Sequence, residues 1–201
     1  MMSNEFWSWF VRKVCSKQRI TLPNVGTFSV VFSKQKSILD ICEMWGNDCP
    51  TINAVTIPRK VYVRFRPTGN LKLSIKNSSQ PKRCYTGDRD PVVSAARWGP
   101  YVRKTKNTSN LSQHRKLIWW YHQENQISLI QAAKIVGTQL QFMGKELSLQ
   151  GRVNLGNGMF IHIIRGKKNV YQHSNNPNRW RARFSIPQED IIQSISSLNI
   201  Q

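Results

Sequence analysis

The sequence predicts an α+β fold of two similar modules, in which helices pack on a short antiparallel β-sheet, joined by a basic connector. A short alternating apolar strand, a Gly/Pro/Asn turn and a second strand occur twice, at residues 19–28 and 152–160. A strand that carries Arg-Phe, stops at a proline and enters a short helix also occurs twice, at residues 63–75 and 182–195. Because both features recur in the same order, we infer an internal repeat.

The composition indicates a folded protein with a polyanionic partner. The chain has 201 residues, of which 30 are Lys or Arg and 10 are Asp or Glu, so its formal net charge is +20. The hydrophobic content of 39% and the aromatic content of 10% argue against a disordered basic tail. This balance argues against an acidic-substrate enzyme, a carboxylate-rich metal protein or a membrane-spanning protein. The four cysteines lack C-x-x-C spacing, so we expect reduced thiols in a soluble protein made in a cytoplasm.

The first module is predicted to cover residues 1–76. There is room for one helix before the hairpin, over about residues 4–17. The hairpin at 19–28 follows from its alternating apolar residues and its Gly/Pro/Asn turn. The strand that follows ends at Pro67, and a short helix is expected next because proline suits the first turn of a helix.

The connector is predicted to cover residues 77–111. Residues 76–116 carry ten Lys or Arg and two Asp, together with turn chemistry that includes Gly99-Pro100. We therefore expect an extended basic segment, in which residues 92–98 form one helical turn or a packed anchor.

The second module is predicted to cover residues 112–201 and to have two leading helices. The first helix is expected from Ser112 to Gln126 and the second from Ser128 to Leu149, where apolar residues follow helical spacing and Ser128 suits the N-cap. We align Phe160 in the hairpin of this module with Phe28 in the first. The first module therefore lacks one helix that the second has.

The order of these elements resembles the HU/IHF family of bacterial histone-like proteins. The turn Leu22-Pro23-Asn24-Val25-Gly26-Thr27-Phe28 is similar to the family's Leu-Pro-Gly-Phe-Gly-Thr-Phe. The segments 56–61 and 65–72 resemble its returning strand and Pro-led final helix. The match covers roughly residues 4–76, whereas residues 112–201 match more weakly.

The resemblance implies a tandem HU/IHF-like fold: helices packed on a short antiparallel β-sheet with extended β-arms, two copies of which form a pseudo-dimer. Family members wrap the minor groove with their arms, and a proline at each tip wedges between base pairs. The first arm would span residues 31–58, where Asp40, Glu43 and Asp48 would repel phosphate and an Arg-Asn-Pro tip is absent. The second would span residues 165–180, where Pro177 is the expected wedge.

The basic residues of the returning strands and of the second arm are the candidate contacts with nucleic acid or an acidic partner. Arg64 and Arg66, like Arg181 and Arg183, alternate and so share one strand face. The alternative is that these side chains face a negative protein surface or lie in solvent. The full set of candidate contacts is Arg59, Lys60, Arg64, Arg66, Lys72, Arg165, Lys167, Lys168, Pro177, Arg179, Arg181 and Arg183.

No other pattern predicts a site, so we expect no enzyme, no metal and no cofactor. Helical aromatics can stack on bases, but they are more commonly core residues; those considered are Trp7, Trp9, Trp119, Trp120 and Tyr121. The four histidines have no metal-ligand spacing. Asp88 and Asp90 could hold Mg²⁺, although a solvated turn explains them better.

Two functions follow from the resemblance. One is an architectural protein that binds and bends duplex DNA. The other is a virion structural protein, similar to the IHF-like virion proteins of crAss-like tailed phages, which forms a ring or adaptor at the portal or head-to-tail connector near packaged DNA. We favour the second because the first arm has acids, one helix is missing and tandem fusion fixes stoichiometry.

The expected partners are further copies of the chain, other virion proteins and double-stranded DNA, with no membrane and no small-molecule substrate. The expected location is the virion, or otherwise the cytoplasm or nucleoid.

Overall fold

The computed structural model describes residues 4–32, 36–41, 52–57, 61–76, 88–165 and 180–186. It confirms the α+β class and contains two small antiparallel three-stranded sheets, ordered β1-β2-β5 and β6-β7-β8, and a two-stranded ribbon, β3-β4. No helix in these ranges is long and apolar enough to span a membrane. The elements are α1 (Asn4–Lys17), β1 (Arg19–Leu22), β2 (Gly26–Phe32), β3 (Lys36–Ile41), β4 (Ile52–Ile57), β5 (Val61–Pro67), α2 (Gly69–Lys76), α3 (Pro91–Thr105), α4 (Gln113–Glu124), α5 (Leu129–Gln150), β6 (Arg152–Gly156), β7 (Met159–Arg165) and β8 (Trp180–Ser185).

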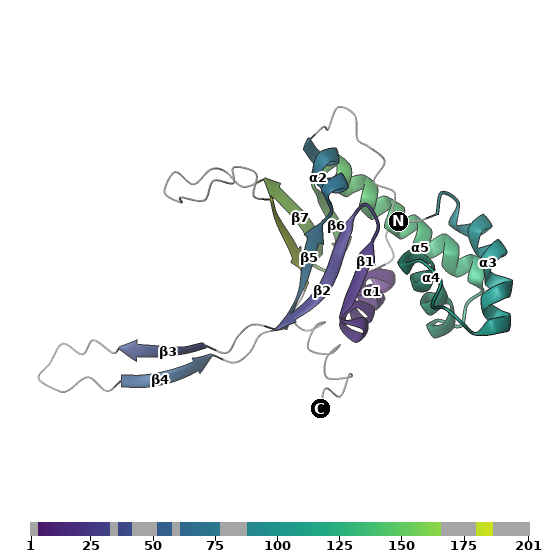
Figure 1. Cartoon of the computed structure of the whole chain (residues 1–201). Helices are drawn as coiled ribbons and strands as arrows, with labels where there is room; N and C mark the ends of the chain where they lie inside the picture. The colour runs from purple at the N-terminus through teal and green to yellow at the C-terminus, as the bar shows by residue number, and fades with distance from the viewer. Residues whose placement is uncertain are drawn as a thin grey trace, which may run out of the picture.

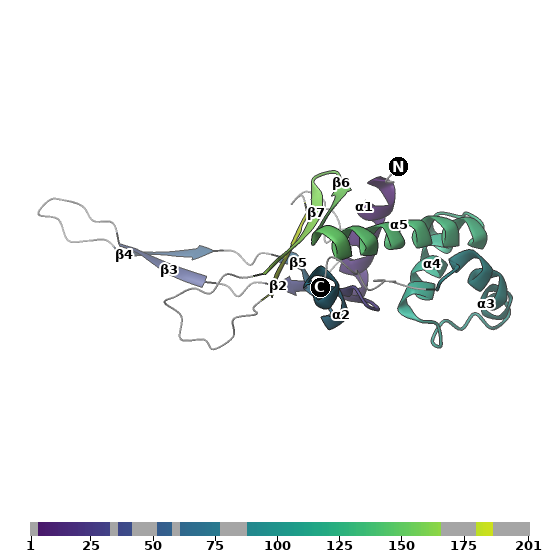
Figure 2. The same cartoon turned by 90° about the horizontal axis from the view of Figure 1, so that it is seen from above.

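The three-stranded sheets lie between the β3–β4 ribbon on one side and the helices on the other (Figure 1 and Figure 2). The long helix α5 connects the sheets to the helical end of the molecule. Near its C-terminus it meets α2 and β6, and Ile75 of α2 reaches Gly151. Along its N-terminal half it packs against α3, where Pro91 approaches Gly137 so closely that a Cβ there would lie 2.3 Å from the proline ring.

The helix and hairpin of each predicted module occur where the sequence places them. In the first, α1 spans residues 4–17 and β1 pairs with β2 from Arg19↔Ser29 to Leu22↔Gly26. In the second, α4 and α5 precede β6 and β7, and Ser128 and Gln131 form a complete capping box at the start of α5. The helix predicted after Pro67 is α2, whereas the one predicted at residues 190–195 lies outside the described residues.

The second hairpin corrects the alignment of Phe160 with Phe28. Phe28 is buried and pairs with Phe65, but Phe160 is exposed and pairs with Ser185. The equivalent of Phe28 is Ile161, which pairs with Phe184. A turn one residue shorter and a register shift between Asn154 and Gly156 cause this difference, because a slip of one residue turns a strand's side chains to the opposite face.

The first arm is a continuation of the ladder between β2 and β5. Lys36 pairs with Ile57, and Ile41 with Ile52, in the register that β2 and β5 already have at Phe32 and Val61. Figure 1 and Figure 2 both show this ribbon projecting away from the helices. The predicted tip of this arm, and most of the second arm, lie outside the described residues.

The expectation of an extended connector is wrong for residues 91–105, which form the 15-residue helix α3. Asp90 caps its N-terminus and Pro91 takes the first helical position, where its missing N–H costs nothing. Gly99 and Pro100, which we interpret from sequence as turn residues, lie inside the helix. Gly99 packs against Leu129 of α5, whose Cδ2 would lie 2.4 Å from a Cβ at this position, so a larger residue would force Leu129 to shift.

Among the described residues, the buried side chains form a single cluster that includes residues of both predicted modules. Phe28 of β2 lies at its centre, with its ring 5.1 Å from Phe10 of α1, 4.7 Å from Phe65 of β5 and 5.4 Å from Phe184 of β8. The third strands of the two sheets, β5 and β8, therefore lie side by side without joining into one sheet.

A charged contact joins α1 to α4 beside this core, between Lys13 and Trp9 of α1 and Glu124 of α4. Glu124 accepts a hydrogen bond from Nε1 of buried Trp9 at 2.7 Å and forms an ion pair with Lys13. Burial raises the pKa of Glu124, but the hydrogen bonds from Lys13 and Trp9 outweigh it and hold that pKa below its ordinary value. Ionised Glu124 therefore stabilises the folded state.

We expect the variant Glu124→Gln to be less stable than the wild type at pH 7, by at most about 1 kcal/mol because the carboxylate is 46% exposed. The folded pKa lies below the unfolded value of about 4.3, so the stabilisation is present above that value and disappears as the pH falls through the folded pKa. Thermal midpoints at pH 7 and pH 3 measure this effect. Glu146→Gln, which removes a carboxylate hydrogen-bonded only to Gln150 in the described part of the chain, is the control. A difference in midpoint between wild type and Glu124→Gln that does not become smaller from pH 7 to pH 3 would contradict the assignment.

Candidate nucleic-acid interface

The sheet β1-β2-β5 presents a row of polar side chains on the face opposite the core. Along β5, Val63 and Phe65 are buried whereas Arg64 and Arg66 are exposed, as the two-residue period of a strand requires. Ser29 lies between Arg19 and Arg64, because it pairs with Arg19 on β1 and with Arg64 on β5. An arginine therefore stands at each end of a row that crosses all three strands.

The sheet β6-β7-β8 presents a matching row. His162 pairs with Arg152 on β6 and with Arg183 on β8. Arg152 and Arg183 are exposed, and His162 is half-buried. The guanidinium of Arg183 lies 5.9 Å from the centre of the Phe160 ring, so the exposed phenylalanine supports that side chain.

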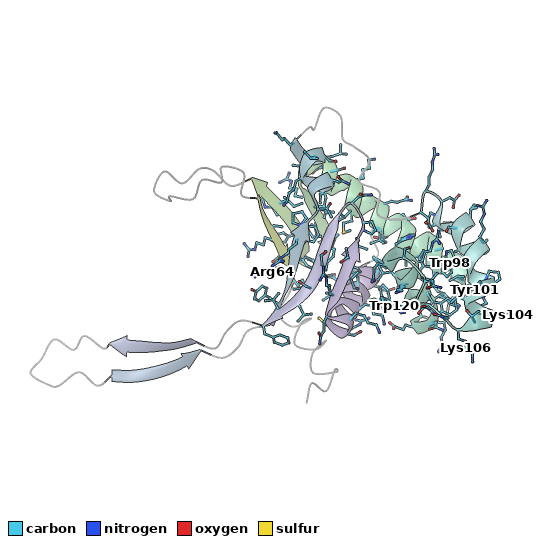
Figure 3. The ribbon with its side chains drawn as sticks, in the orientation of Figure 1. Arg64, Trp98, Tyr101, Lys104, Lys106 and Trp120 are labelled. Atoms are coloured by element: carbon cyan, nitrogen blue, oxygen red, sulfur yellow. The ribbon has the colours of Figure 1, made fainter. Side chains whose placement is uncertain are left out.

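The two rows lie on neighbouring sheets, and in the second row Arg152 and His162 line a pocket together with Phe142, Glu146 and Gln150 of α5. Arg64 and Arg183 belong to β5 and β8, the strands that lie side by side. Figure 3 shows Arg64 on the side of the sheets that faces away from the helical end. We call the exposed faces that carry Arg19, Ser29 and Arg64, and Arg152, His162 and Arg183, the outer sheet faces.

The outer sheet faces are positively charged without compensation from their own strands. The six strands of the two sheets contain seven arginines and neither aspartate nor glutamate. Thr21, Thr27 and Ser29 supply hydroxyl groups on the same side of β1 and β2, and Thr21 and Thr27 lie 3.1 Å apart between their oxygens. Guanidinium and hydroxyl donors on a solvent-exposed sheet are suited to binding phosphate oxygens.

Three of the predicted contacts, Arg64, Arg66 and Arg183, lie on the outer sheet faces. In the ladder between β7 and β8, Arg181 pairs with Ile164 and Arg165 pairs with Trp180. Lys72 is half-buried and lies on the helix α2, whereas the two rows lie on strands. Six predicted contacts lie outside the described residues: Arg59, Lys60, Lys167, Lys168, Pro177 and Arg179.

Sequence reasoning missed Arg19, Arg152 and His162 as contacts. The repeat contains the signal for the two arginines, because each opens one copy of the repeated hairpin. Both precede a buried aliphatic residue, Ile20 or Val153, and so must point outward when that residue points to the core. His162 depends on the register shift in the second hairpin, which no local pattern indicates.

The remaining candidates have structural roles. Asp88 and Asp90 are not a solvated turn, because Arg115 donates two hydrogen bonds to Asp88, at 2.8 and 3.1 Å, and Asp90 caps α3. Burial raises the pKa of Asp88, but hydrogen bonds from Arg115 and Ser94 outweigh it and lower that pKa overall. Of the helical aromatics, Trp7, Trp9, Trp119 and Tyr121 are core residues. No cluster of three possible metal ligands from His, Cys, Asp and Glu occurs in the described ranges.

Comparison with protein-family models, curated proteins and solved structures found no match to this chain.

Proposed function

We propose that this chain is a non-enzymatic structural protein in which two HU/IHF-like modules form a pseudo-dimer that holds the backbone of duplex DNA against the outer sheet faces. The observation that carries this proposal is the pair of matching rows, Arg19-Ser29-Arg64 and Arg152-His162-Arg183. Exposed arginines at equivalent positions of two adjacent sheets form a regular cationic surface. Regularly spaced phosphates are the polyanion that such a surface fits best.

The pseudo-dimer part of the proposal is supported by how the two halves pack. Each three-stranded sheet has a hairpin followed by a returning strand, and the returning strands β5 and β8 are neighbours. The helix that follows the first returning strand, α2, packs on α5 of the other half. Phe28 and Phe184, from different halves, share one ring contact.

We propose a virion as the setting, with the chain as part of a ring or adaptor near packaged DNA. The first arm supports a protein neighbour rather than the minor groove. In the twelve residues of β3 and β4, KSILDI and INAVTI, there is one lysine, one aspartate and a majority of apolar residues. A ribbon of this composition is poorly suited to wrapping phosphates, but it is suited to packing against another protein.

The alternative is an architectural DNA-bending protein, and the outer sheet faces favour it equally. The two functions differ in whether the DNA is bent. Bending by this fold requires an arm that enters the minor groove and inserts a side chain between base pairs. The described part of the first arm has one basic residue, a lysine, with which to contact phosphates.

A salt titration with a short labelled duplex tests the nucleic-acid contact. If six arginines or more touch phosphates, affinity should fall by roughly 10³-fold or more between 50 and 200 mM salt. Energy transfer between dyes at the two duplex ends reports bending, and we expect no change on binding. Absent or salt-independent binding would contradict the phosphate contact, and a strong bend would select the architectural alternative.

The virion setting has its own test. Quantitative protein analysis of purified particles should find the chain at a copy number set by the ring symmetry of the connector. Its absence from particles that contain the portal would sink the virion proposal and leave the DNA contact unaffected.

A further inference from the structure

The helical end of the molecule carries a second basic surface, separate from the outer sheet faces. Residues 91–123, which include α3 and all of α4 except its last residue, Glu124, contain no aspartate or glutamate. Figure 3 shows Tyr101, Lys104, Lys106 and Trp120 gathered at this end, with Arg64 across the molecule from them. The bases in this stretch are Arg97, Arg103, Lys104, Lys106, Arg115 and Lys116.

A groove of about 400 Å³ lies between α3 and α4 at this end. Arg103 and Lys106, from the end of α3, line one wall together with Thr108. Trp119, Trp120 and Gln123 of α4 line the other. Arg103 and Lys106 are exposed, and neither forms an ion pair with a carboxylate of the described residues. We call this feature the α3–α4 groove.

Further cations gather at the indole of Trp120. The Nζ atoms of Lys13 and Lys17 lie 5.3 and 5.2 Å from the centre of its ring. Lys13 forms an ion pair with Glu124, and Lys17, which forms no ion pair in the described part of the chain, also helps to lower the pKa of Glu124. Trp120 is half-buried, unlike the core residue Trp119 beside it. One partly exposed ring thus has two lysines beside it, one of which is paired with Glu124.

We propose that the α3–α4 groove binds single-stranded nucleic acid, with phosphates at Arg103 and Lys106 and a base against Trp120. Cations that track a backbone beside an aromatic ring are the combination by which proteins hold single strands. A duplex offers phosphates but keeps its base faces stacked, so the indole wall would have no role in binding it. An acidic peptide would use the cations but gain little from the indoles.

The site goes beyond the proposed function because it lies between α3 and α4, whereas the proposed duplex contacts lie on the strands of the two sheets. A chain with both sites holds a duplex at one end and a strand without a complement at the other. This arrangement fits a place where a duplex terminates or opens, and it does not require that the duplex be bent.

Binding of a short fluorescein-labelled oligothymidylate to the intact chain, followed by anisotropy, tests the groove. The variant Arg103→Gln/Lys106→Gln should bind it about tenfold or more weakly, and the salt slope should become shallower by about 1.4, or 0.7 for each phosphate that no longer meets a cation. Trp120→Leu should bind it about fivefold or more weakly with an unchanged salt slope, because the variant removes base stacking and leaves the phosphate-binding cations in place. The thermal midpoint of each variant verifies that it is folded.

The matched control is Lys134→Gln/Lys145→Gln, which removes two exposed charges from α5 and should leave oligothymidylate binding unchanged. Unchanged binding by Arg103→Gln/Lys106→Gln would overturn the proposal. Equal competition by a polyglutamate of the same charge would also overturn it and assign the groove to an acidic protein segment. Displacement of oligothymidylate by saturating duplex would place both ligands at one site, against the proposal. If the wild type binds oligothymidylate but no duplex, the groove stands and the proposed function fails.

Discussion

Replacing Arg19, Arg64, Arg152 and Arg183 together by glutamine is expected to weaken duplex binding about 100-fold or more at moderate salt. Each arginine stands at the end of a row on the outer sheet faces, is exposed, and has no carboxylate on its own sheet to neutralise it. Each arginine that neutralises a phosphate contributes about −0.9 to the slope of log affinity against log salt concentration. Removing four such arginines therefore makes the slope shallower by about 3.6. Titrations of wild type and variant over 50–200 mM salt measure both quantities.

The control for this experiment removes the same charge from another part of the surface. Arg12, Arg97, Lys134 and Lys145 are exposed on α1, α3 and α5, and their joint replacement by glutamine also removes four positive charges. If binding depends on the outer sheet faces, this variant should keep most of the wild-type salt slope. Equal weakening in the two variants would show that net charge alone governs binding, and the row geometry would then have no part in it.

Replacing Phe28 by alanine is expected to destabilise the fold by about 3–5 kcal/mol. Its ring is fully buried and contacts Phe10, Phe65 and Phe184, so the cavity would open between α1 and both sheets at once. Urea denaturation followed by circular dichroism measures the free energy of unfolding. If the alanine variant does not fold, Phe28→Leu should still be measurable, with a decrease in stability below about 1.5 kcal/mol.

Phe32→Ala provides a comparison with the same chemistry on the same strand. Phe32 lies four residues along β2 from Phe28 and is 52% exposed, so its removal leaves no closed cavity and should cost less than about 1 kcal/mol. Similar destabilisation of the two variants would mean that Phe28 is not the centre of a core shared by the two halves.

The parts of the fold that depend on local signals were predictable. The span of α1, both hairpins and the start of α5 at Ser128 follow from apolar spacing, turn residues and a capping pattern, which act within a few residues of each other. The helix α3 was not predictable in this way. Gly99-Pro100 is typical of a turn, and no local signal shows that Gly99 lies inside a helix and packs against Leu129, thirty positions away in the chain.

The candidate site was half predictable for the same reason. The alternation around Arg64 and Arg183 identifies exposed arginines from the strand alone. Which residues they stand beside is a matter of register, and register in the second hairpin changes at the irregularity between Asn154 and Gly156. The α3–α4 groove required two helices that the sequence places in different predicted segments.

β5 packs against β8 and Phe28 touches Phe184, so the two halves make their contact within one polypeptide. Two separate subunits would dissociate on dilution, and their folded fraction would depend on concentration. A covalently continuous pair stays assembled even when a single molecule is present. A symmetric dimer also receives every substitution twice, once in each subunit, whereas here a change enters one half alone. Serine at the centre of one row and histidine at the centre of the other, Ser29 and His162, show this freedom: each half can be tuned without altering its counterpart.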